Sequence, residues 1–157
     1  MKHTLLILFI SYSFLQAKLC IAQIPKKNAF NIVGVFDGRT PCQDLAKQLD
    51  EKVTSACTKI KWRIILYKDS ITGNPDIYEL LGFVYKKDNP RIGKWRIIKG
   101  TKANPEAIVY QLDQPGREPL FLQKGGENIL FFLNQEKILM VGNRDFSYTL
   151  NRADKGY

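Results

Sequence analysis

Two cysteines are the side chains of this sequence with the most distinctive chemistry. Cys42 and Cys57 are separated by fourteen residues, and a third cysteine, Cys20, lies near the N-terminus. A pair of thiols can form a structural disulfide, act as a redox switch or bind a soft metal ion. Because Cu(I) accepts a small number of soft ligands, Cys42 and Cys57 are also candidate copper ligands, which Met140 could assist.

The near absence of histidine limits the catalytic chemistry of the chain. His3 is the only histidine. It lies in the N-terminal segment that we expect to be cleaved, so the mature protein would have none. Neither a Ser–His–Asp triad nor a Cys–His pair could then form, and the commonest ligand of zinc would be missing. Asp37 and Asp44 flank a Pro-Cys turn, but carboxylates beside turns and helix starts are typical caps, so we do not assign them as an acid–base pair. We therefore predict no catalytic residues and no enzymatic activity.

The first 22 residues have the features of a secretory signal. Lys2 precedes an almost unbroken apolar run over residues 5–15, and Ala22 offers a small residue for cleavage. The run is shorter than the roughly 20 apolar residues that a membrane-spanning helix needs. We expect residues 1–22 to be removed as a signal peptide. Residues 23–157 are then one domain without a transmembrane segment, soluble and either periplasmic or secreted.

A lysine near the cleavage site argues against a lipid anchor. Lipoprotein signals place small residues before the modified cysteine, whereas Lys18 lies two positions before Cys20. Cys20 therefore leaves with the signal, and an even pair remains. Since paired cysteines in exported proteins are usually bonded, a structural disulfide between Cys42 and Cys57 is the first expectation, ahead of a metal or redox site.

The charge of the chain is compatible with acidic partners but does not by itself indicate one. The formal net charge is +9, and it falls to +7 when Lys2 and Lys18 leave with the signal. A basic protein attracts nucleic acid, anionic lipid or acidic polysaccharide. However, basic residues such as Lys59, Lys61 and Arg63 are spread singly along predicted strands, which favours a solvated surface. We predict no nucleic-acid partner.

Short alternating segments dominate the remainder of the chain. One helix is expected over residues 43–56, where Leu45, Leu49 and Val53 share a face. Alternation at period two predicts strands over residues 30–36, 59–68, 77–86, 93–99, 107–113, 120–123, 128–134, 137–141 and 146–152. The short hairpin connections favour a mainly β fold, a small antiparallel up-and-down barrel of the lipocalin-like type with eight or nine strands. A β-sandwich is the main competitor.

Large aromatic residues fall on the apolar phase of these strands. They are Trp62, Trp95, Phe131 and Tyr148. Small eight-stranded barrels either fill their interior with such side chains or leave room for one small ligand. We assign the four residues to the core rather than to the lining of a pocket.

The order of these elements resembles the N-terminal domain of the NlpE family, envelope lipoproteins linked to copper resistance and stress response. Residues 38–42 match the family turn Gly-x-x-Pro-Cys, and residues 58–68 match the long alternating strand that follows its second cysteine. Residues 93–95 match a Gly-x-Trp strand, and residues 146–150 match the closing aromatic-x-Tyr-x-Leu strand. The resemblance covers about residues 30–152 and implies a β-barrel with a role in copper handling or envelope-stress signalling.

Three departures from the family pattern weaken the functional implication. The family Cys-x-x-Cys pair is opened here to Cys42 and Cys57 by an inserted helix. The lipidation cysteine and the second domain that some members carry are missing. The sequence therefore predicts an exported non-catalytic module that binds or senses an unknown small ligand or envelope protein. Binding of Cu(I) through Cys42 and Cys57 is the first alternative, and a thiol-disulfide redox protein is the second. The oligomeric state stays open.

Overall fold

The structure is a computed structural model that describes residues 30–82 and 87–154. The predicted signal peptide and Cys20 lie outside the described residues, and so does the end of the strand predicted over residues 77–86. None of the helices in the described part is long and apolar enough to cross a membrane.

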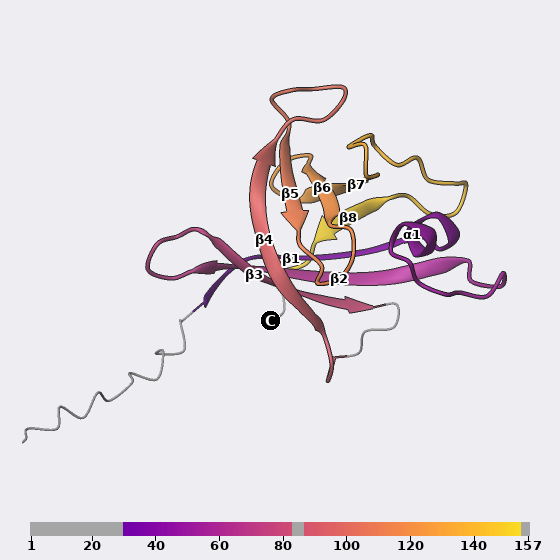
Figure 1. Ribbon diagram of the computed structural model, residues 1–157, viewed down its shortest axis with the longest axis horizontal. Coiled ribbons are helices and arrows are strands. Elements are labelled where there is room, and N and C mark those ends of the chain that lie inside the picture. The colour runs from indigo at the N-terminus through magenta and orange to yellow at the C-terminus, as the bar shows by residue number, and fades with distance from the viewer. Residues whose placement is uncertain (1–29, 83–86, 155–157) are drawn as a thin grey trace, which may run out of the picture.

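Eight strands and one short helix make up the described chain (Figure 1). In chain order they are β1 (Phe30–Pro41), α1 (Gln43–Gln48), β2 (Lys59–Asp69), β3 (Pro75–Gly82), β4 (Arg91–Lys99), β5 (Ile108–Leu112), β6 (Leu120–Lys124), β7 (Ile129–Leu133) and β8 (Thr149–Arg152). Each strand pairs antiparallel with the next, and β8 pairs with β1, so the sheet closes into a barrel. The predicted mainly β, up-and-down barrel with one helix near its start is confirmed.

Alternation along β2 shows why these segments form a barrel. Ile60, Trp62, Ile64 and Leu66 are each at most 4% exposed, whereas Lys59 and Lys61 face solvent. Successive strand residues point to opposite faces of a sheet, so one side of β2 enters the core and the other is wet. Full burial of each such side chain contributes about 1.5–3 kcal/mol, and closure leaves no open edge to pair with another chain.

The interior of the barrel is filled with large side chains. The Trp62 ring packs on Phe132 with centroids 5.2 Å apart, and Trp95 packs edge-on against Tyr110 at the same separation. Trp62, Trp95 and Tyr148 are buried, as predicted. Phe131 was assigned wrongly: it is only partly buried, and its neighbour Phe132 points inward instead.

The ninth predicted strand, over residues 137–141, does not form. Lys137 has a positive φ of 57° in a turn, and Leu139 makes only an isolated bridge to Leu133. Two backbone hydrogen bonds, from Met140 N–H to the Phe132 carbonyl and from Asn134 N–H to the Ile138 carbonyl, join the segment to the end of β7, but the pairing goes no further. Met140 packs against the core, whereas the Lys137 amine approaches the ring of Phe121.

Three other boundaries differ from the prediction. β1 continues through the expected turn at residues 37–41, because Arg39 and Pro41 pair with β2. β8 is a short strand from Thr149 and does not begin at Phe146. The helix ends at Gln48 rather than at residue 56.

The early end of α1 has a tertiary cause. Asp50 takes a positive φ of 52°, which breaks the helix, and Glu51 then turns to ion-pair with Arg117. The same Arg117 donates to the Leu49 carbonyl at 2.7 Å. The expected apolar face is still buried, since Leu45 and Leu49 are at most 5% exposed.

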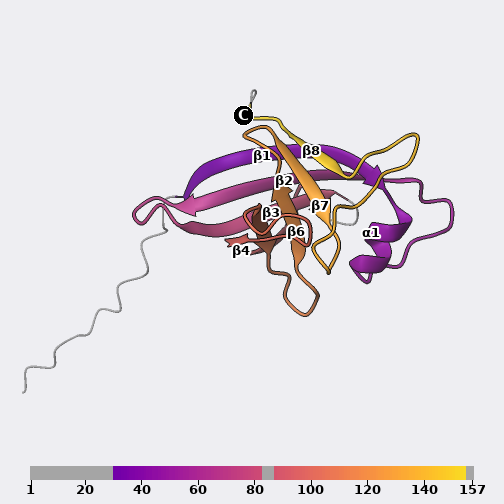
Figure 2. The same ribbon diagram turned by 90° about the horizontal axis from the view of Figure 1, so that it is seen from above.

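The helix lies at one end of the barrel and the β2–β3 turn lies at the other (Figures 1 and 2). A partly buried hydrogen bond from the Tyr148 hydroxyl to the Asp44 carboxylate, at 3.1 Å, links α1 to the residue just before β8. Burial raises the pKa of Tyr148 well above its ordinary value, and the Asp44 charge raises it further. The helix is therefore fixed to this end of the barrel by a specific side-chain contact.

Candidate functional site

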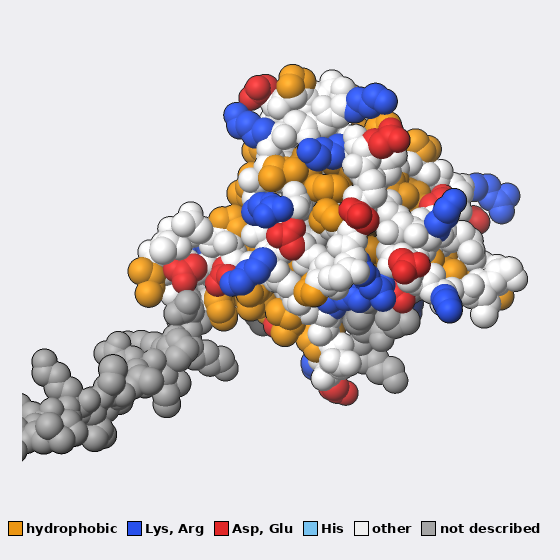
Figure 3. Space-filling view, in the orientation of Figure 1, with side chains coloured by type: hydrophobic (Ala, Val, Ile, Leu, Met, Phe, Trp, Pro, Cys, Tyr) orange, Lys and Arg blue, Asp and Glu red, His pale blue; other side chains and the backbone are white. Residues whose placement is uncertain are grey.

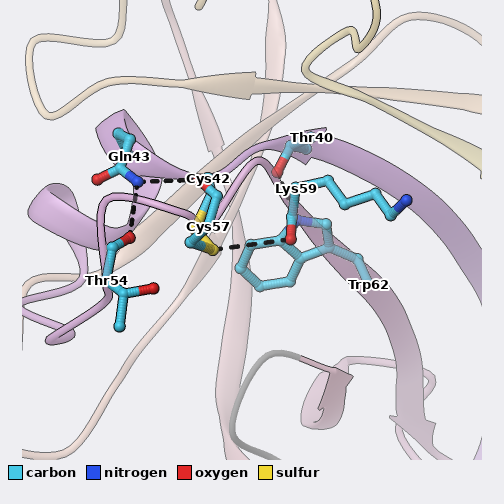
Figure 4. Close-up of a disulfide and its surroundings, with 7 residues drawn as sticks. All are labelled: Thr40, Cys42, Gln43, Thr54, Cys57, Lys59 and Trp62. Atoms are coloured by element: carbon cyan, nitrogen blue, oxygen red, sulfur yellow. Dashed lines mark hydrogen bonds between the residues drawn. A yellow bond between two sulfur atoms is a disulfide. The ribbon is translucent and has the colours of Figure 1, made fainter.

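Cys42 and Cys57 form a disulfide at the base of the β1–β2 connection, the segment that carries α1 (Figure 4). Their Cα atoms are 5.8 Å apart, within the ordinary range for this bond. Cys42 directly follows β1 and is 1% exposed, whereas Cys57 precedes β2 and is partly exposed. The predicted pairing is confirmed, and the bond links the end of β1 to the segment that precedes β2.

Side chains around the disulfide also stabilise the base of the β1–β2 connection. The Gln43 amide donates to the carbonyl oxygens of Thr54 and Cys57 at 3.1 and 2.9 Å (Figure 4). Just inside the barrel, the Trp62 indole N–H donates to the Thr40 hydroxyl at 2.8 Å. Both partners of that bond are buried, so breaking it would leave an unsatisfied polar group in the core.

The disulfide bears directly on the thiol alternatives. Because each sulfur is bonded to the other, neither Cys42 nor Cys57 offers a thiolate while the bond is intact. Copper binding and redox exchange are thus predictions about the reduced protein. Among the residues that the structure describes, no three His, Cys, Asp or Glu side chains gather closely enough to hold a metal ion.

The two carboxylates near the Pro-Cys turn are engaged separately. Asp37 accepts two hydrogen bonds from the Arg63 guanidinium, at 2.8 and 2.6 Å. Asp44 accepts the bond from Tyr148. The helix N-cap, Cys42, has no side-chain cap, so the prediction that these carboxylates act as caps is wrong. The two are not brought together as an acid–base pair.

A hollow of about 500 Å³ lies on the outside of the barrel, close to the disulfide end. It runs across β8, β1 and β2. The described residues that line it are Asp37, Gly38, Arg39, Lys61, Trp62, Arg63, Ser147, Thr149, Asn151, Arg152 and Ala153. We call this hollow the basic groove, because four of these side chains are cationic and one is acidic.

Two cations in the basic groove, Arg39 and Lys61, have no counter-ion among the described residues. Arg39 on β1 lies directly opposite Lys61 on β2 in the strand register. Both are exposed, and neither makes an ion pair with a residue in the described ranges 30–82 and 87–154. Like charges at facing positions of an antiparallel pair repel each other and destabilise the sheet. The groove therefore presents a focus of positive charge that folding alone does not require.

The next row of the groove combines donors and acceptors. Asp37 pairs in register with Arg63 on one side and with Asn151 on the other. The Asp37–Arg63 contact is bidentate, which fixes both groups in one geometry, and each side chain is still 37% exposed. Thr149 and Ser147 add hydroxyl groups along the β8 side of the hollow.

A second hollow of about 600 Å³ adjoins the basic groove across β2. The two share Lys61, Trp62 and Arg63, and the second continues over β3, where its described lining includes Leu81 and Lys87. Its one described acidic side chain is Glu79 on β3. Burial raises the pKa of the nearby Tyr67 hydroxyl above its ordinary value, and the charge of Glu79 raises it further.

Closure of the barrel beneath the basic groove depends on Gly38. A Cβ at this position would come within 2.5 Å of the Thr149 carbonyl oxygen, which is backbone and has no room to move. The missing side chain lets β1 and β8 approach closely, and it places Arg39 and Asn151 on one continuous surface.

The sequence did not reveal the basic groove, because local alternation does not show which residues of β1 and β2 lie opposite each other, or that β8 pairs with β1. Elsewhere the surface agrees with the predicted solvated character: on the face shown in Figure 3, basic, acidic and apolar side chains are interspersed. The missing information was the pairing register of β1 and β2. The cysteine pair could have supplied it, because the disulfide marks the point at which the two strands begin to pair.

This end of the barrel presents charged and hydrogen-bonding groups on its outer surface. Arg39 and Lys61 supply positive charge, and Asp37 and Asn151 supply hydrogen-bonding groups. Comparisons with protein-family models, with curated proteins and with solved structures find no match to this chain.

Proposed function

We propose that this protein is an exported, non-catalytic binding or sensing module of the cell envelope, and that it recognises an acidic partner through the basic groove. The observation that carries the proposal is that Arg39 and Lys61 face each other across β1 and β2 and make no ion pair with a described residue. A charge arrangement that weakens the fold is expected where a bound anion offsets the repulsion.

The filled interior directs the proposal to the outside of the barrel. Core side chains such as Trp62, Phe132 and Leu122 are at most 4% exposed. Small barrels of eight strands hold an internal ligand only when side chains leave space for it. The larger hollows near the disulfide are on the outer surface, so an acidic partner would be met there.

The disulfide and the predicted signal support an extracytoplasmic setting. Disulfides persist in oxidising compartments, and the apolar run over residues 5–15 is typical of an export signal. The resemblance to the envelope proteins of the NlpE family agrees with this assignment.

Binding of a small, multiply sulfonated fluorescent dye tests the proposal. Fluorescence anisotropy of the dye should show saturable binding to the wild-type protein, which weakens as salt is added. The double variant Arg39→Ala/Lys61→Ala should bind the dye about tenfold more weakly, because each exposed ionic contact contributes up to about 1 kcal/mol.

A charge-matched control separates the groove from net charge. Lys47 and Lys52 are exposed and make no ion pair with a described residue, and neither lines a described part of the groove. Lys47→Ala/Lys52→Ala removes the same charge and should leave dye binding nearly unchanged. Equal losses in the two double variants would show that net charge alone attracts anions, and the proposal would then be wrong.

A further inference from the structure

We infer that the acidic partner is a linear anionic polysaccharide, which lies across the basic groove and continues into the second hollow; this inference rests on the proposed function. The two hollows share Lys61 and Arg63, so the cationic surface is a track and not an isolated point. Of the described residues that line the two hollows, five are basic and two are acidic. A track of this kind matches a polymer that carries charge at repeated positions.

The dimensions of the track exceed those of a single sugar. It crosses β8, β1, β2 and β3, and adjacent strands lie about 4.8 Å apart, so it is on the order of 14 Å wide. Arg39 and Lys61 offer one position for an anionic group. Arg63 lies two residues along β2 from Lys61, about 7 Å away, and Lys87 extends the charge into the second hollow.

The polar groups between the cations favour a sugar over a simple anion. A sugar hydroxyl both donates and accepts a hydrogen bond, so it needs acceptors as well as donors around it. Asp37, held by Arg63, is an acceptor in the middle of the track, and Asn151 and Thr149 offer both functions beside it. An ion recognised by charge alone would gain nothing from the Asp37 carboxylate, which would repel it.

Other polyanions fit this surface less well. Single-stranded nucleic acid binds proteins by stacking its bases on exposed aromatic rings, but Trp62, the one aromatic residue in the described lining, is 4% exposed. An extended acidic peptide adds to a free strand edge, and the closed barrel offers none there. A membrane surface requires apolar residues that enter it beside the basic ones, and no described residue of the basic groove is an exposed large apolar side chain.

Calorimetric titration of the purified protein with size-defined oligosaccharides tests the inference. Sulfated oligomers from heparin and carboxylated oligomers of galacturonic acid form two arms, which separate sulfate from carboxylate as the preferred group. A neutral maltohexaose and a single-stranded oligodeoxynucleotide of equal charge are the comparison ligands. We expect affinity to rise from disaccharide to hexasaccharide in at least one anionic arm, with the oligonucleotide binding at least tenfold more weakly.

Three variants make the test specific to the track. Arg39→Ala/Lys61→Ala should reduce saccharide affinity about tenfold, whereas Lys47→Ala/Lys52→Ala should not. Asn151→Ala changes no charge but removes a hydrogen-bonding group, so it should weaken saccharide binding several-fold and sulfonated-dye binding by a smaller factor. Circular dichroism of each variant checks that the barrel is intact.

The possible outcomes distinguish this inference from the proposed function. If the oligonucleotide binds as tightly as the saccharides and Asn151→Ala has no effect, the groove recognises charge alone, and only the polysaccharide inference fails. If maltohexaose binds as well as the acidic oligomers, anion recognition is wrong too. If the dye and every oligomer bind the two double variants alike, both the inference and the proposed function are overturned.

Discussion

Reducing the Cys42–Cys57 disulfide should lower the free energy of unfolding by about 3 kcal/mol without unfolding the barrel. The bond closes a loop between residues fifteen positions apart. A cross-link of this span removes conformational entropy from the unfolded chain that corresponds to about 3 kcal/mol at room temperature. In the folded state the end of β1 should stay next to the start of β2 without the bond, because Pro41 pairs with Lys59 and the Gln43 amide bridges the same segments. Small domains are stable by about 5–15 kcal/mol, so the reduced protein should remain folded.

The double variant Cys42→Ala/Cys57→Ala should lose slightly more stability than the reduced protein. Both lack the cross-link, but the variant also lacks the Cys42 sulfur, which is 1% exposed and packs in the core. Loss of one buried heavy atom adds about 1 kcal/mol through reduced packing. The partly exposed Cys57 contributes little. We therefore expect total losses of about 3 kcal/mol for reduction and about 4 kcal/mol for the variant.

Urea unfolding of oxidised, reduced and variant protein measures these differences. Trp62 and Trp95 are both 4% exposed, so their fluorescence should report the loss of the core in all three forms. Superimposable curves for the oxidised and reduced protein would refute the loop-closure reasoning. Rapid alkylation of both cysteines in native, freshly isolated protein would contradict the disulfide itself and would favour the copper alternative, which requires free thiols.

Three further predictions concern the barrel and its surface. Thr40→Val should cost about 1–3 kcal/mol because it leaves the buried Trp62 N–H without an acceptor, whereas Thr40→Ser should cost less; thermal unfolding compares them. Since the pKa of Tyr148 is raised in the folded state, stability should fall as the pH rises above about 10, the unfolded value, and Tyr148→Phe should reduce that slope in urea titrations at several alkaline pH values. Lys61→Glu should stabilise the protein by up to about 1 kcal/mol, since it replaces repulsion from Arg39 by attraction, and should abolish binding of the sulfonated dye; a variant that binds the dye normally would exclude this position from the site.

Period-two alternation predicted the fold well where one face of a strand is polar. In β2, Lys61 and Arg63 separate the apolar residues Ile60, Trp62 and Ile64, and the structure buries the expected set. β7 has no such contrast, because Ile129–Leu133 is apolar at every position. In a strand that is apolar at every position, the sequence does not show which side chains face the core. Phe131 could therefore not be distinguished from Phe132 without the partner strands. Pairing with β6 and packing against Trp62 decide which ring enters the core.

The errors in helix and strand boundaries also have long-range causes. Leu45, Leu49 and Val53 have helical spacing, but Glu51 is drawn to Arg117, some 66 residues away, and the backbone leaves the helix to reach it. Local propensity has no information on such a contact. The extra strand over residues 137–141 was predicted from local alternation, but the barrel closes through β8, and this segment makes only an isolated bridge to the end of β7.

The disulfide and the basic groove are connected through the register of one hairpin. The Cys42–Cys57 bond joins the chain where β1 and β2 meet, and from that point the pairing places Arg39 opposite Lys61. A slip by one residue would turn the strand over and send these cations toward the core, so register must be held firmly where the facing charges oppose it. Cross-strand repulsion contributes at most about 1 kcal/mol, and the cross-link contributes about 3 kcal/mol. The stabilising effect therefore exceeds the local repulsion, which explains how the fold can keep two unpaired cations together on a sheet surface.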